Sequence, residues 1–258
     1  MHGSDSVNRF GAVLAAALAE LEDRRREIDD LNVFPVADGD TGRNMVMTLR
    51  GLVDAIDSLR LSVGGADLTD INRDLVVKAV ARAALSSAHG NSGVILSQLI
   101  RGAASELGGS KGRKVSPYLL GRAMRGAAEQ GIASTPSPRE GTMLTVARDI
   151  AEALEAAYPE PEWLPEETVP ADQDALLAEA LEIAVEAGTR SVDRGPELLD
   201  VLREKGVVDA GGYGLVVIVA GALAGLRGEE RSTLPRREPP RIPVTEGRGP
   251  ERFGFCVN

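Results

Sequence analysis

The chain has one cysteine, two histidines and few aromatic residues, and each shortage narrows what it can be. Cys256 has no second cysteine for an internal disulfide, and with only His2 and His89 beside it a zinc cluster is not expected. Aromatic residues make up 3% of the 258 residues, whereas Ala, Leu and Val are abundant. That mixture favours closely packed helices over sheets rich in aromatic and β-branched residues, so we expect an all-α fold.

A long basic track is also missing, because the short arginine run at 24–26 is flanked by acidic residues, and the formal net charge is -10. The backbone of a nucleic acid would be repelled, so we expect no nucleic acid partner. A single nucleotide is still compatible with this charge, because a divalent cation held by carboxylates can bridge an acidic protein to a phosphate.

Two targeting features are absent as well. Residues Met1–Phe10 lack the charged and apolar regions of an export signal. The longest apolar stretch, Leu215–Leu226, is too short to span a bilayer and is interrupted by glycine. We therefore predict a cytoplasmic protein without a membrane span, whose 43% hydrophobic content is enough for a real core.

Apolar residues recur at helical spacing along most of the chain, and no segment alternates convincingly as a strand would. A first helix is predicted around Phe10–Leu21 and a second through Met45–Ile56. The pairs Ser116–Pro117 and Gly195–Pro196 are typical of an N-cap followed by a first helical residue. Further helices are predicted near residues 70–87, 92–107, 117–131, 141–157, 173–193, 197–205 and 212–227, so we expect about eight or nine helices in all.

Composition also separates a folded part from a tail. Residues 158–170 hold several prolines among acidic residues, which indicates an excursion between two helices that Trp163 anchors to the surface. The sequence after Gly228 is rich in charge, Pro and Gly. We expect a nucleotide-binding domain over 1–228, a linker over 229–250, and at 251–258 the start of a following domain.

The first chemical motif is Asp38-Gly39-Asp40, in the loop before the helix at Met45. Because one glycine separates the two aspartates, a tight turn can point both carboxylates to one side. Such a pair can hold Mg²⁺, a hard cation that often combines one or two carboxylates with phosphate oxygens. The alternative is an Asx-turn in which these side chains cap the next helix.

The second motif, Ser86–Gly93, joins one helix to the next. Its glycines would let backbone N–H groups approach a phosphate, and the following helix directs its positive end at the same place. The alternative is an ordinary helix start with Asn91 or Ser92 as the N-cap.

Two further loops, Glu140–Met143 and Val207–Gly214, also precede helices. Glycines that open a long apolar helix cost on the order of 1 kcal/mol each against alanine, so they indicate close approach of a ligand or of another helix. Alternate loops of an up-and-down bundle lie at the same end, so all four loops can form one rim.

Four sequence strings carry a family resemblance. LNVFPVADGDTGRNM (31–45), GNSGVILSQ (90–98), EGTMLTV (140–146) and GVVDAGG (206–212) resemble the N-terminal, nucleotide-binding domain of bacterial fatty acid kinase. That domain is similar to the nucleotide-binding L subunit of dihydroxyacetone kinase. The resemblance covers roughly residues 5–227. It implies an antiparallel up-and-down barrel of about eight helices that binds ATP or ADP with two Mg²⁺ ions at one rim.

The resemblance also implies roles for single residues. Asp38 and Asp40 match the carboxylates that ligate Mg²⁺ and serve catalysis, and Asn32 lies near the place of a third aspartate in dihydroxyacetone kinase. Thr41 replaces the histidine usual there, which favours the fatty acid kinase branch. His89 stands at the phosphates where many fatty acid kinases have arginine. The other implied nucleotide contacts are Thr41, Asn44, Gly90, Asn91, Ser92 and Gly93 near the phosphates, and Thr142, Met143, Asp209 and Gly211 near the nucleoside.

These roles imply the Mg-ATP-binding, phosphoryl-donor domain of a fatty acid kinase, which makes an acyl phosphate for phospholipid synthesis. An acyl carboxylate is already ionised, so the lack of an obvious catalytic His or Lys is no objection. The family implies a fatty-acid-binding carrier protein of the DegV-like type and further domains, and it allows a homodimer. Alone, the chain is expected to bind ATP without completing turnover. The alternatives are a noncatalytic nucleotide-binding regulatory module and a dihydroxyacetone kinase component of the L type.

Overall fold

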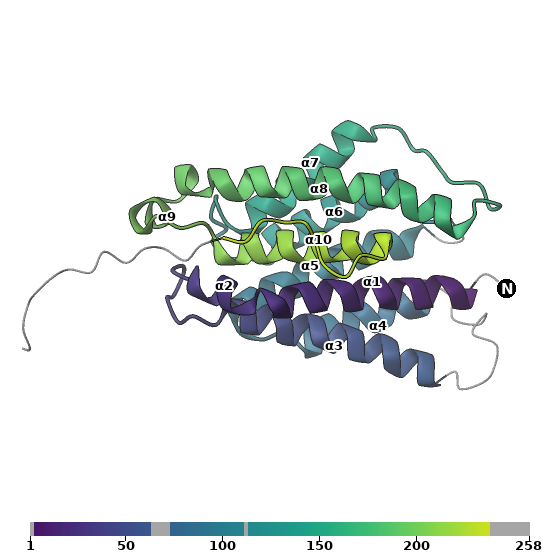
Figure 1. Cartoon of the computed structure of the whole chain (residues 1–258), viewed down its shortest axis with the longest axis horizontal. Coiled ribbons are helices and arrows are strands. Elements are labelled where there is room, and N and C mark those ends of the chain that lie inside the picture. Colours follow the sequence, from purple (N-terminus) through teal and green to yellow (C-terminus); the bar gives the residue numbers. More distant parts are fainter. Residues whose placement is uncertain (1–2, 63–72, 111–112, 238–258) are drawn as a thin grey trace, which may run out of the picture.

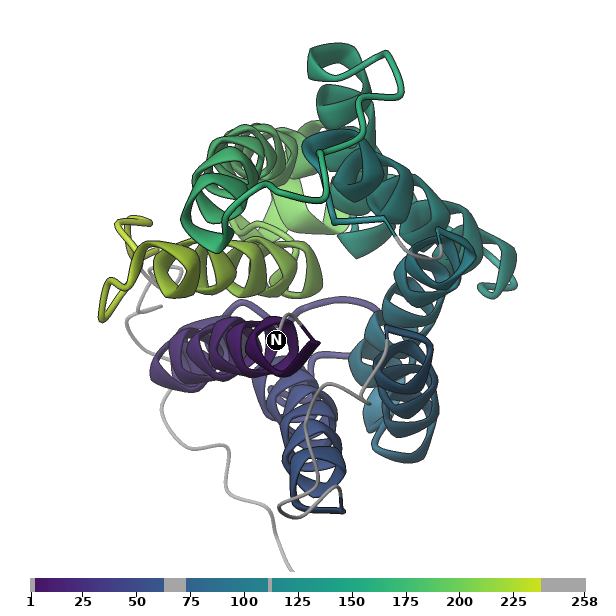
Figure 2. The same ribbon diagram turned by 90° about the vertical axis from the view of Figure 1, so that its right-hand side faces the viewer.

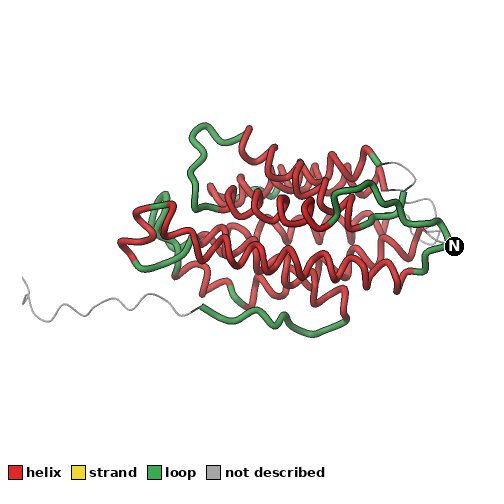
Figure 3. Tube along the Cα trace, turned by 90° about the horizontal axis from the view of Figure 1, so that it is seen from above, coloured by secondary structure: helices red, strands yellow, loops and turns green. Residues whose placement is uncertain are grey.

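The computed structural model describes residues 3–62, 73–110 and 113–237, and within these ranges it consists of ten α-helices without a β-strand (Figure 3). The predicted all-α fold is therefore confirmed. Each predicted helix is present, although the helices at Gly3–Asp23, Thr41–Ser62 and Pro170–Leu198 extend five to seven residues beyond the expected bounds at one end. A short helix at Arg25–Asp30 is additional. In chain order the helices are α1 (Gly3–Asp23), α2 (Arg25–Asp30), α3 (Thr41–Ser62), α4 (Arg73–Ser86), α5 (Gly90–Gly109), α6 (Pro117–Ala133), α7 (Met143–Ala157), α8 (Pro170–Leu198), α9 (Asp200–Lys205) and α10 (Ala210–Arg227).

The eight long helices form a closed antiparallel barrel (Figures 1 and 2). They pack as neighbours in the order α1, α3, α4, α5, α6, α7, α8 and α10, and α10 returns to α1. Because successive long helices alternate in direction, the starts of α3, α5, α7 and α10 lie at one end, beside the short helices α2 and α9 (Figure 1). We call this end the rim. It gathers the four loops that the sequence analysis singles out.

Most residues of α10 are buried, which explains the apolar run in the sequence. By length and composition this helix could cross a membrane, but 61% of it is buried inside the barrel. Its small residues let α1 approach closely: a Cβ at Gly221 would stand 2.8 Å from the Ala17 Cα, and a Cβ at Gly225 3.2 Å from the Val13 Cα. The apolar character of α10 thus follows from its place in the core.

The predicted helix start at Gly195–Pro196 is wrong. Pro196 lies inside α8, and the chain turns only at Leu199, before α9 begins. Proline is tolerated here because the helix ends within its next turn, so few hydrogen bonds are lost. The other pair behaves as predicted: the Ser116 Oγ caps α6 by accepting the Leu119 N–H at 3.3 Å.

The proline-rich segment between α7 and α8 is held by Trp163, as predicted. Its ring meets the Tyr118 ring edge-on, with the two centroids 5.6 Å apart. The guanidinium carbon of Arg113 lies 3.8 Å from the Trp163 ring centroid. These contacts fix the excursion against the start of α6.

The chain after α10 returns along the side of the barrel (Figures 1 and 3). Residues 229–237, which we call the strap, run from the far end of α10 back toward the rim, and Leu234 packs against the hydrophobic core. The strap forms the first part of the predicted linker. The rest of that linker and the expected domain start at 251–258 lie outside the described residues. A domain boundary at residue 228 stays a prediction.

Candidate functional site

The start of α3 is capped from α2. The Asp29 carboxylate accepts the backbone N–H groups of Gly42 and Arg43, the latter at 3.1 Å. Burial raises the pKa of Asp29, and these hydrogen bonds together with nearby arginines only partly offset the rise. Asp29 therefore does the capping that the Asx-turn alternative gave to Asp38 and Asp40. The two loop aspartates are left for another role.

Asp38 is joined to a buried asparagine. The Asp38 side chain is exposed, and its Oδ1 accepts a 2.7 Å hydrogen bond from Asn32 Nδ2. Asn32 is only 7% exposed, and its own Oδ1 is a buried acceptor without a hydrogen-bond partner. A buried unpaired oxygen costs about 1–3 kcal/mol, so this atom is well suited to an oxygen-seeking cation.

Asp40 lies directly before α3 and is partly buried. Its main-chain oxygen accepts the Asn44 N–H at 2.9 Å, which begins the helical hydrogen bonding. In the described part of the chain, the Asp40 carboxylate has no hydrogen bond or ion pair. It stands at the positive end of α3, where negative charge such as that of a phosphate is attracted.

The helix α5 begins at Gly90, so the alternative with Asn91 or Ser92 as N-cap is wrong. His89 occupies the N-cap position, and its side chain makes no capping hydrogen bond. The Gly93 N–H makes the first helical hydrogen bond, to the His89 oxygen at 3.0 Å. The amides before it have no partner within the helix, and they are donors at its positive end.

Glycine is required in this loop because α3 lies close beneath it. Gly90 has a φ of 56°, and a Cβ there would overlap the side-chain amide of Asn44. A Cβ at Gly93 would overlap the Thr48 hydroxyl. The buried Thr48 also receives the His89 N–H at 3.4 Å. The sequence GNSG thus fits the surface of α3 and places the Asn44 amide against the loop.

Side chains join the two loops at the rim. Thr41 Oγ1 and Ser92 Oγ lie 3.2 Å apart. His89 and Asn91 are exposed, and the His89 Nδ1 lies 2.8 Å from the Ser87 carbonyl oxygen. The structure therefore joins the loop before α3, which holds the predicted magnesium residues, to the predicted phosphate loop, and Asp38, His89 and Asn91 are exposed there.

Asp209 joins the other two loops. Its carboxylate accepts the Gly212 N–H at 2.7 Å in its own helix and the N–H of Met143, the first residue of α7. Burial raises the pKa of Asp209 to about 6, although both amide hydrogen bonds oppose the rise. A Cβ at Gly211 would stand 2.9 Å from the Met143 Cε, so close helix packing explains this glycine.

The loop at Thr142 is fixed by its own hydrogen bonds. Thr142 Oγ1 donates to the Arg139 carbonyl oxygen at 2.7 Å and does not cap α7. Thr145 Oγ1 accepts the Gly141 N–H at 2.9 Å and donates to Glu140 Oε2 at 3.0 Å. This loop and Asp209 together form a hydrogen-bonded cluster, which we call the wall. It lies in the second half of the rim, where α7 and α10 begin.

The predicted site residues thus fall into two groups. The group around the starts of α3 and α5 combines exposed residues, such as Asp38 and Asn91, with the buried residues Asn32, Thr41 and Asn44, and the group at α7 and α10 is mostly buried. Packing links the groups: a Cβ at Gly214 would stand 2.6 Å from the Met45 sulfur. Sequence reasoning missed Asp29 and Thr48. Thr48 lies one turn after Asn44 on the same face of α3, a spacing that could have indicated it. Asp29 stands in a charged run that carries no such signal.

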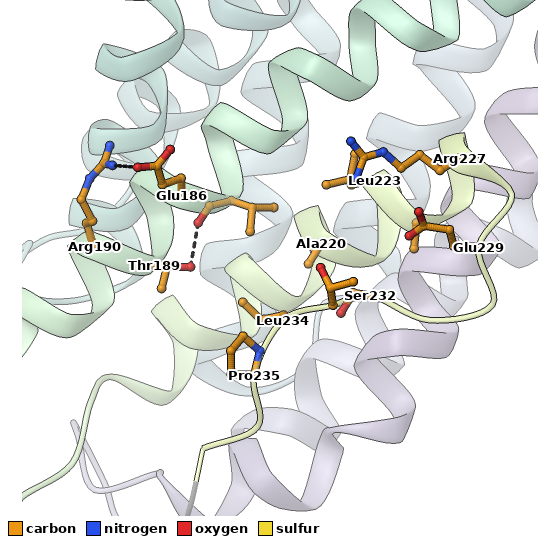
Figure 4. A pocket seen from close by; sticks show the side chains of 13 residues that line it. Glu186, Thr189, Arg190, Ala220, Leu223, Arg227, Glu229, Ser232, Leu234 and Pro235 are labelled. Carbon is orange, nitrogen blue, oxygen red and sulfur yellow. Dashed lines mark hydrogen bonds and ion pairs between the residues drawn. The ribbon is translucent and has the colours of Figure 1, made fainter.

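Two cavities of about 290 Å³ each are lined by residues of α8, α10 and the strap. The first is bounded by α8, α10 and the strap, with Leu234 and Pro235 closing one side (Figure 4). The second lies between Tyr213 and the end of the strap. No predicted site residue lines either cavity, so the candidate site is defined by its side-chain chemistry and not by cavity size.

Comparisons with known proteins agree with this fold. The DAK2 domain matches residues 35–224. The chain is 33% identical over 228 residues to protein YloV of Bacillus subtilis, covering 88% of this chain and 36% of that protein. It is 34% identical over 222 residues to an uncharacterized protein of Staphylococcus epidermidis, covering 86% and 36%. The chain therefore spans about a third of the length of these relatives.

A solved structure has the same fold. The dihydroxyacetone kinase from C. freundii, determined in complex with AMP-PNP and Mg²⁺, superposes with a TM-score of 0.51 at 18% sequence identity. The match covers 82% of this chain and 32% of that one. At this identity the likeness shows the helical fold alone.

Proposed function

The chain belongs to the DAK2 domain family, and from that membership we propose that it binds Mg-ATP at the rim as the phosphoryl-donor domain of a kinase. The observation that carries the proposal is the buried, unpartnered Oδ1 of Asn32, whose amide nitrogen is bonded to the exposed Asp38. The AMP-PNP and Mg²⁺ in the dihydroxyacetone kinase complex support the same pair of ligands.

Asn32, Asp38 and Asp40 are the oxygen donors that we assign to magnesium. Within the described ranges, no three His, Cys, Asp or Glu side chains are grouped to hold a metal, so the protein does not complete a coordination shell alone. Mg²⁺ takes few protein ligands and adds water and phosphate oxygens, which suits a Mg-nucleotide at this loop. When bound, the cation neutralises charge on the transferring phosphoryl group, and the family resemblance implies two such ions.

The phosphates are assigned to the start of α5. The free amides from Gly90 to Ser92 are donors at a positive helix end, and glycine lets an anion come close to them. The Asn44 amide lies against Gly90, and the Thr41 and Ser92 hydroxyls lie 3.2 Å apart at the same loop. His89 stands at its edge in place of an arginine.

The nucleoside is assigned to the second half of the rim. Thr142, Met143 and Gly211 belong to the wall that Asp209 ties together through two amide hydrogen bonds. Most of this wall is buried, so we propose that it shapes the nucleoside site and does not contact the nucleoside through charged groups.

A fatty acid carboxylate is the acceptor that we propose. Its oxygen attacks the γ-phosphorus of ATP, the bond from that phosphorus to the β-phosphate oxygen breaks, and ADP leaves. Support comes from the family resemblance, in which Thr41 replaces the histidine usual in dihydroxyacetone kinase and Asn32 lies near the place of its third aspartate. A DegV-like carrier protein would present the fatty acid, and further domains of a longer protein would complete turnover.

The test follows phosphate from labelled ATP. The chain, joined to the C-terminal region of a longer relative, is offered oleate with and without a carrier protein, or dihydroxyacetone. We expect an acyl phosphate only with oleate and carrier, and none from Asp38→Asn. Asp30→Asn, which removes an exposed carboxylate outside the site, is the matched control.

Other outcomes decide between the alternatives. Phosphorylated dihydroxyacetone would identify a dihydroxyacetone kinase component of the L type. ATP binding without transfer to either acceptor would indicate a regulatory module, and absence of Mg-ATP binding would reject the proposed function.

A further inference from the structure

The strap rests on a buried ion pair. Glu20 Oε1 of α1 and Arg24 Nε, just after that helix, lie 2.6 Å apart, and both side chains are only 4% exposed. The Glu20 carboxylate accepts the N–H and the hydroxyl of Ser232, at 3.2 and 2.7 Å. The Arg24 guanidinium donates to the carbonyl oxygens of Leu234 and, at 3.1 Å, Pro235. Two buried charged side chains therefore bind the backbone of the strap. A solvated linker would not be held by such contacts.

The end of the strap is held by α2. Glu27 Oε1 accepts the Tyr213 hydroxyl at 2.6 Å and also the backbone N–H of Arg237. The Arg237 guanidinium lies 5.3 Å from the centroid of the Tyr213 ring. Burial and the hydrogen bond to Glu27 raise the pKa of Tyr213 to about 12, so its hydroxyl keeps the proton that it donates. One carboxylate thus joins α2, α10 and the strap.

The same short helix builds the magnesium loop. Two residues after Glu27, Asp29 caps the start of α3 through the amides of Gly42 and Arg43. The Asn32 N–H donates to the Asp29 carbonyl oxygen at 3.1 Å. A helix of six residues has little stability of its own, so its geometry depends on such tertiary contacts.

We propose that Glu27 is a positioning residue through which the docked strap holds the magnesium loop in its binding geometry. The inference rests on the proposed function. When the strap is seated, Glu27 fixes α2, and α2 sets both the Asp29 cap and the place of Asn32. When the strap is released, α2 loses a hydrogen bond on one side and the loop loses part of its preorganisation, so Mg-ATP binds more weakly.

A matched pair of full-length variants isolates the strap contact. Arg237→Pro removes the backbone N–H that Glu27 accepts, and Arg237→Ala keeps that N–H. Both variants lose the arginine side chain and its ion pair with Asp193, so these losses cancel in the comparison. Arg231→Ala is the control, because Arg231 also pairs the strap with α1, through Asp23 at 3.5 Å. Asp23 itself is kept, because its other partner, Arg236, also lies 3.7 Å from Glu27.

Hydrogen exchange and nucleotide affinity are measured on the same samples. Relative to Arg237→Ala, we expect Arg237→Pro to exchange faster at the Gly42 and Arg43 amides. Its Mg-ATP Kd should rise about fivefold or more, the lower range of coupling between sites. Glu27→Ala should show both effects, and Glu27→Gln, which keeps an oxygen acceptor, should recover most of the affinity. Arg231→Ala should match the wild type in both measurements.

Unchanged exchange over residues 25–44 in Arg237→Pro and Glu27→Ala would overturn the inference. Faster exchange with unchanged affinity would overturn it too, because the strap would then be structural only. A wild-type chain that binds no Mg-ATP would reject the proposed function, and the exchange data alone would still decide whether the strap positions the loop.

Discussion

Thr41 Oγ1 and Ser92 Oγ lie 3.2 Å apart although 51 positions separate the two residues in the chain. The contact joins the loop that carries Asp38 and Asp40 to the start of α5, where free amides are available. A cation on one loop and an anion on the other would be neighbours, so the binding of each should depend on the other.

Changing Asp38 or Asp40 to alanine should weaken Mg-ATP binding at least about tenfold, a loss of about 1.4 kcal/mol, because a magnesium ligand disappears. The helical content should stay intact, since Asp29 caps α3 in both variants. Calorimetry with and without Mg²⁺, beside circular dichroism, measures both. Wild-type Mg-ATP affinity in both variants would rule out the assignment.

Asn32→Asp should destabilise the chain without magnesium and respond more strongly to the ion. It replaces the amide that donates to Asp38 with a second carboxylate, and like charges at this distance repel. We expect a lower Tm in EDTA and a recovery in millimolar Mg²⁺ that exceeds the wild-type response. An equal loss of Tm in both buffers would mean that the Asn32 oxygen does not face a cation.

Gly90→Val should lose more nucleotide affinity than stability. Valine at a φ of 56° is strained, and its side chain would overlap the Asn44 amide where a phosphate must come close. Ser92→Ala should cost less, of order 1 kcal/mol, because it removes one hydroxyl and leaves the amides. Tm and ATP affinity on both variants test this. Intact affinity in Gly90→Val would refute the phosphate assignment.

Asp209 should make stability fall with rising pH. Folding raises its pKa from 3.8 to about 6, so the folded chain favours the protonated acid. The resulting stabilisation is fully present below about pH 4 and is lost by about pH 6; a two-unit shift corresponds to about 3 kcal/mol. Relative to wild type, Asp209→Asn should therefore gain stability between pH 4 and pH 7. Urea unfolding at both pH values should show it, and a constant difference would contradict the shift.

Two C-terminal truncations should distinguish the contribution of the strap to stability from that of the residues after it. Removal of 238–258 should leave the Tm unchanged, whereas removal of 229–258 uncovers the Glu20–Arg24 pair and the surface under Leu234. A loss of about 1–3 kcal/mol would lower the Tm by about 2–10 °C in a chain of this size. Equal melting of the two shortened chains would instead support a domain boundary at residue 228.

The helices could be predicted because apolar spacing and capping residues act locally. The Ser116 cap is predicted correctly for this reason. The prediction at Gly195–Pro196 was wrong because the local sequence does not distinguish a proline in the last turn of a helix from a proline at a helix start. The strap could not be predicted, since its contacts use backbone N–H and C=O groups that every residue carries, and only Leu234 offered an apolar sign.

At the candidate site, the loops were found from glycines and small polar residues, and their meeting followed from the alternation of helix directions. The role of Asp29 could not be predicted, because the amides that it caps come 13 and 14 positions later and only the fold brings them together. The burial of Met143 and Asp209 was likewise a tertiary property. Residue identity supplied the hypothesis about the chemistry, and the packing of the fold decides which of these side chains are exposed.

Because the strap runs back along the barrel, a group joined to its end would be tethered close to the rim. Arg237 is bonded to α2, beside the rim, and not at the opposite end where α10 finishes. A group tethered a short way beyond this residue would meet the rim at an effective concentration on the order of millimolar, without any affinity of its own. Even a weakly binding acceptor domain would then encounter the nucleotide as an intramolecular event.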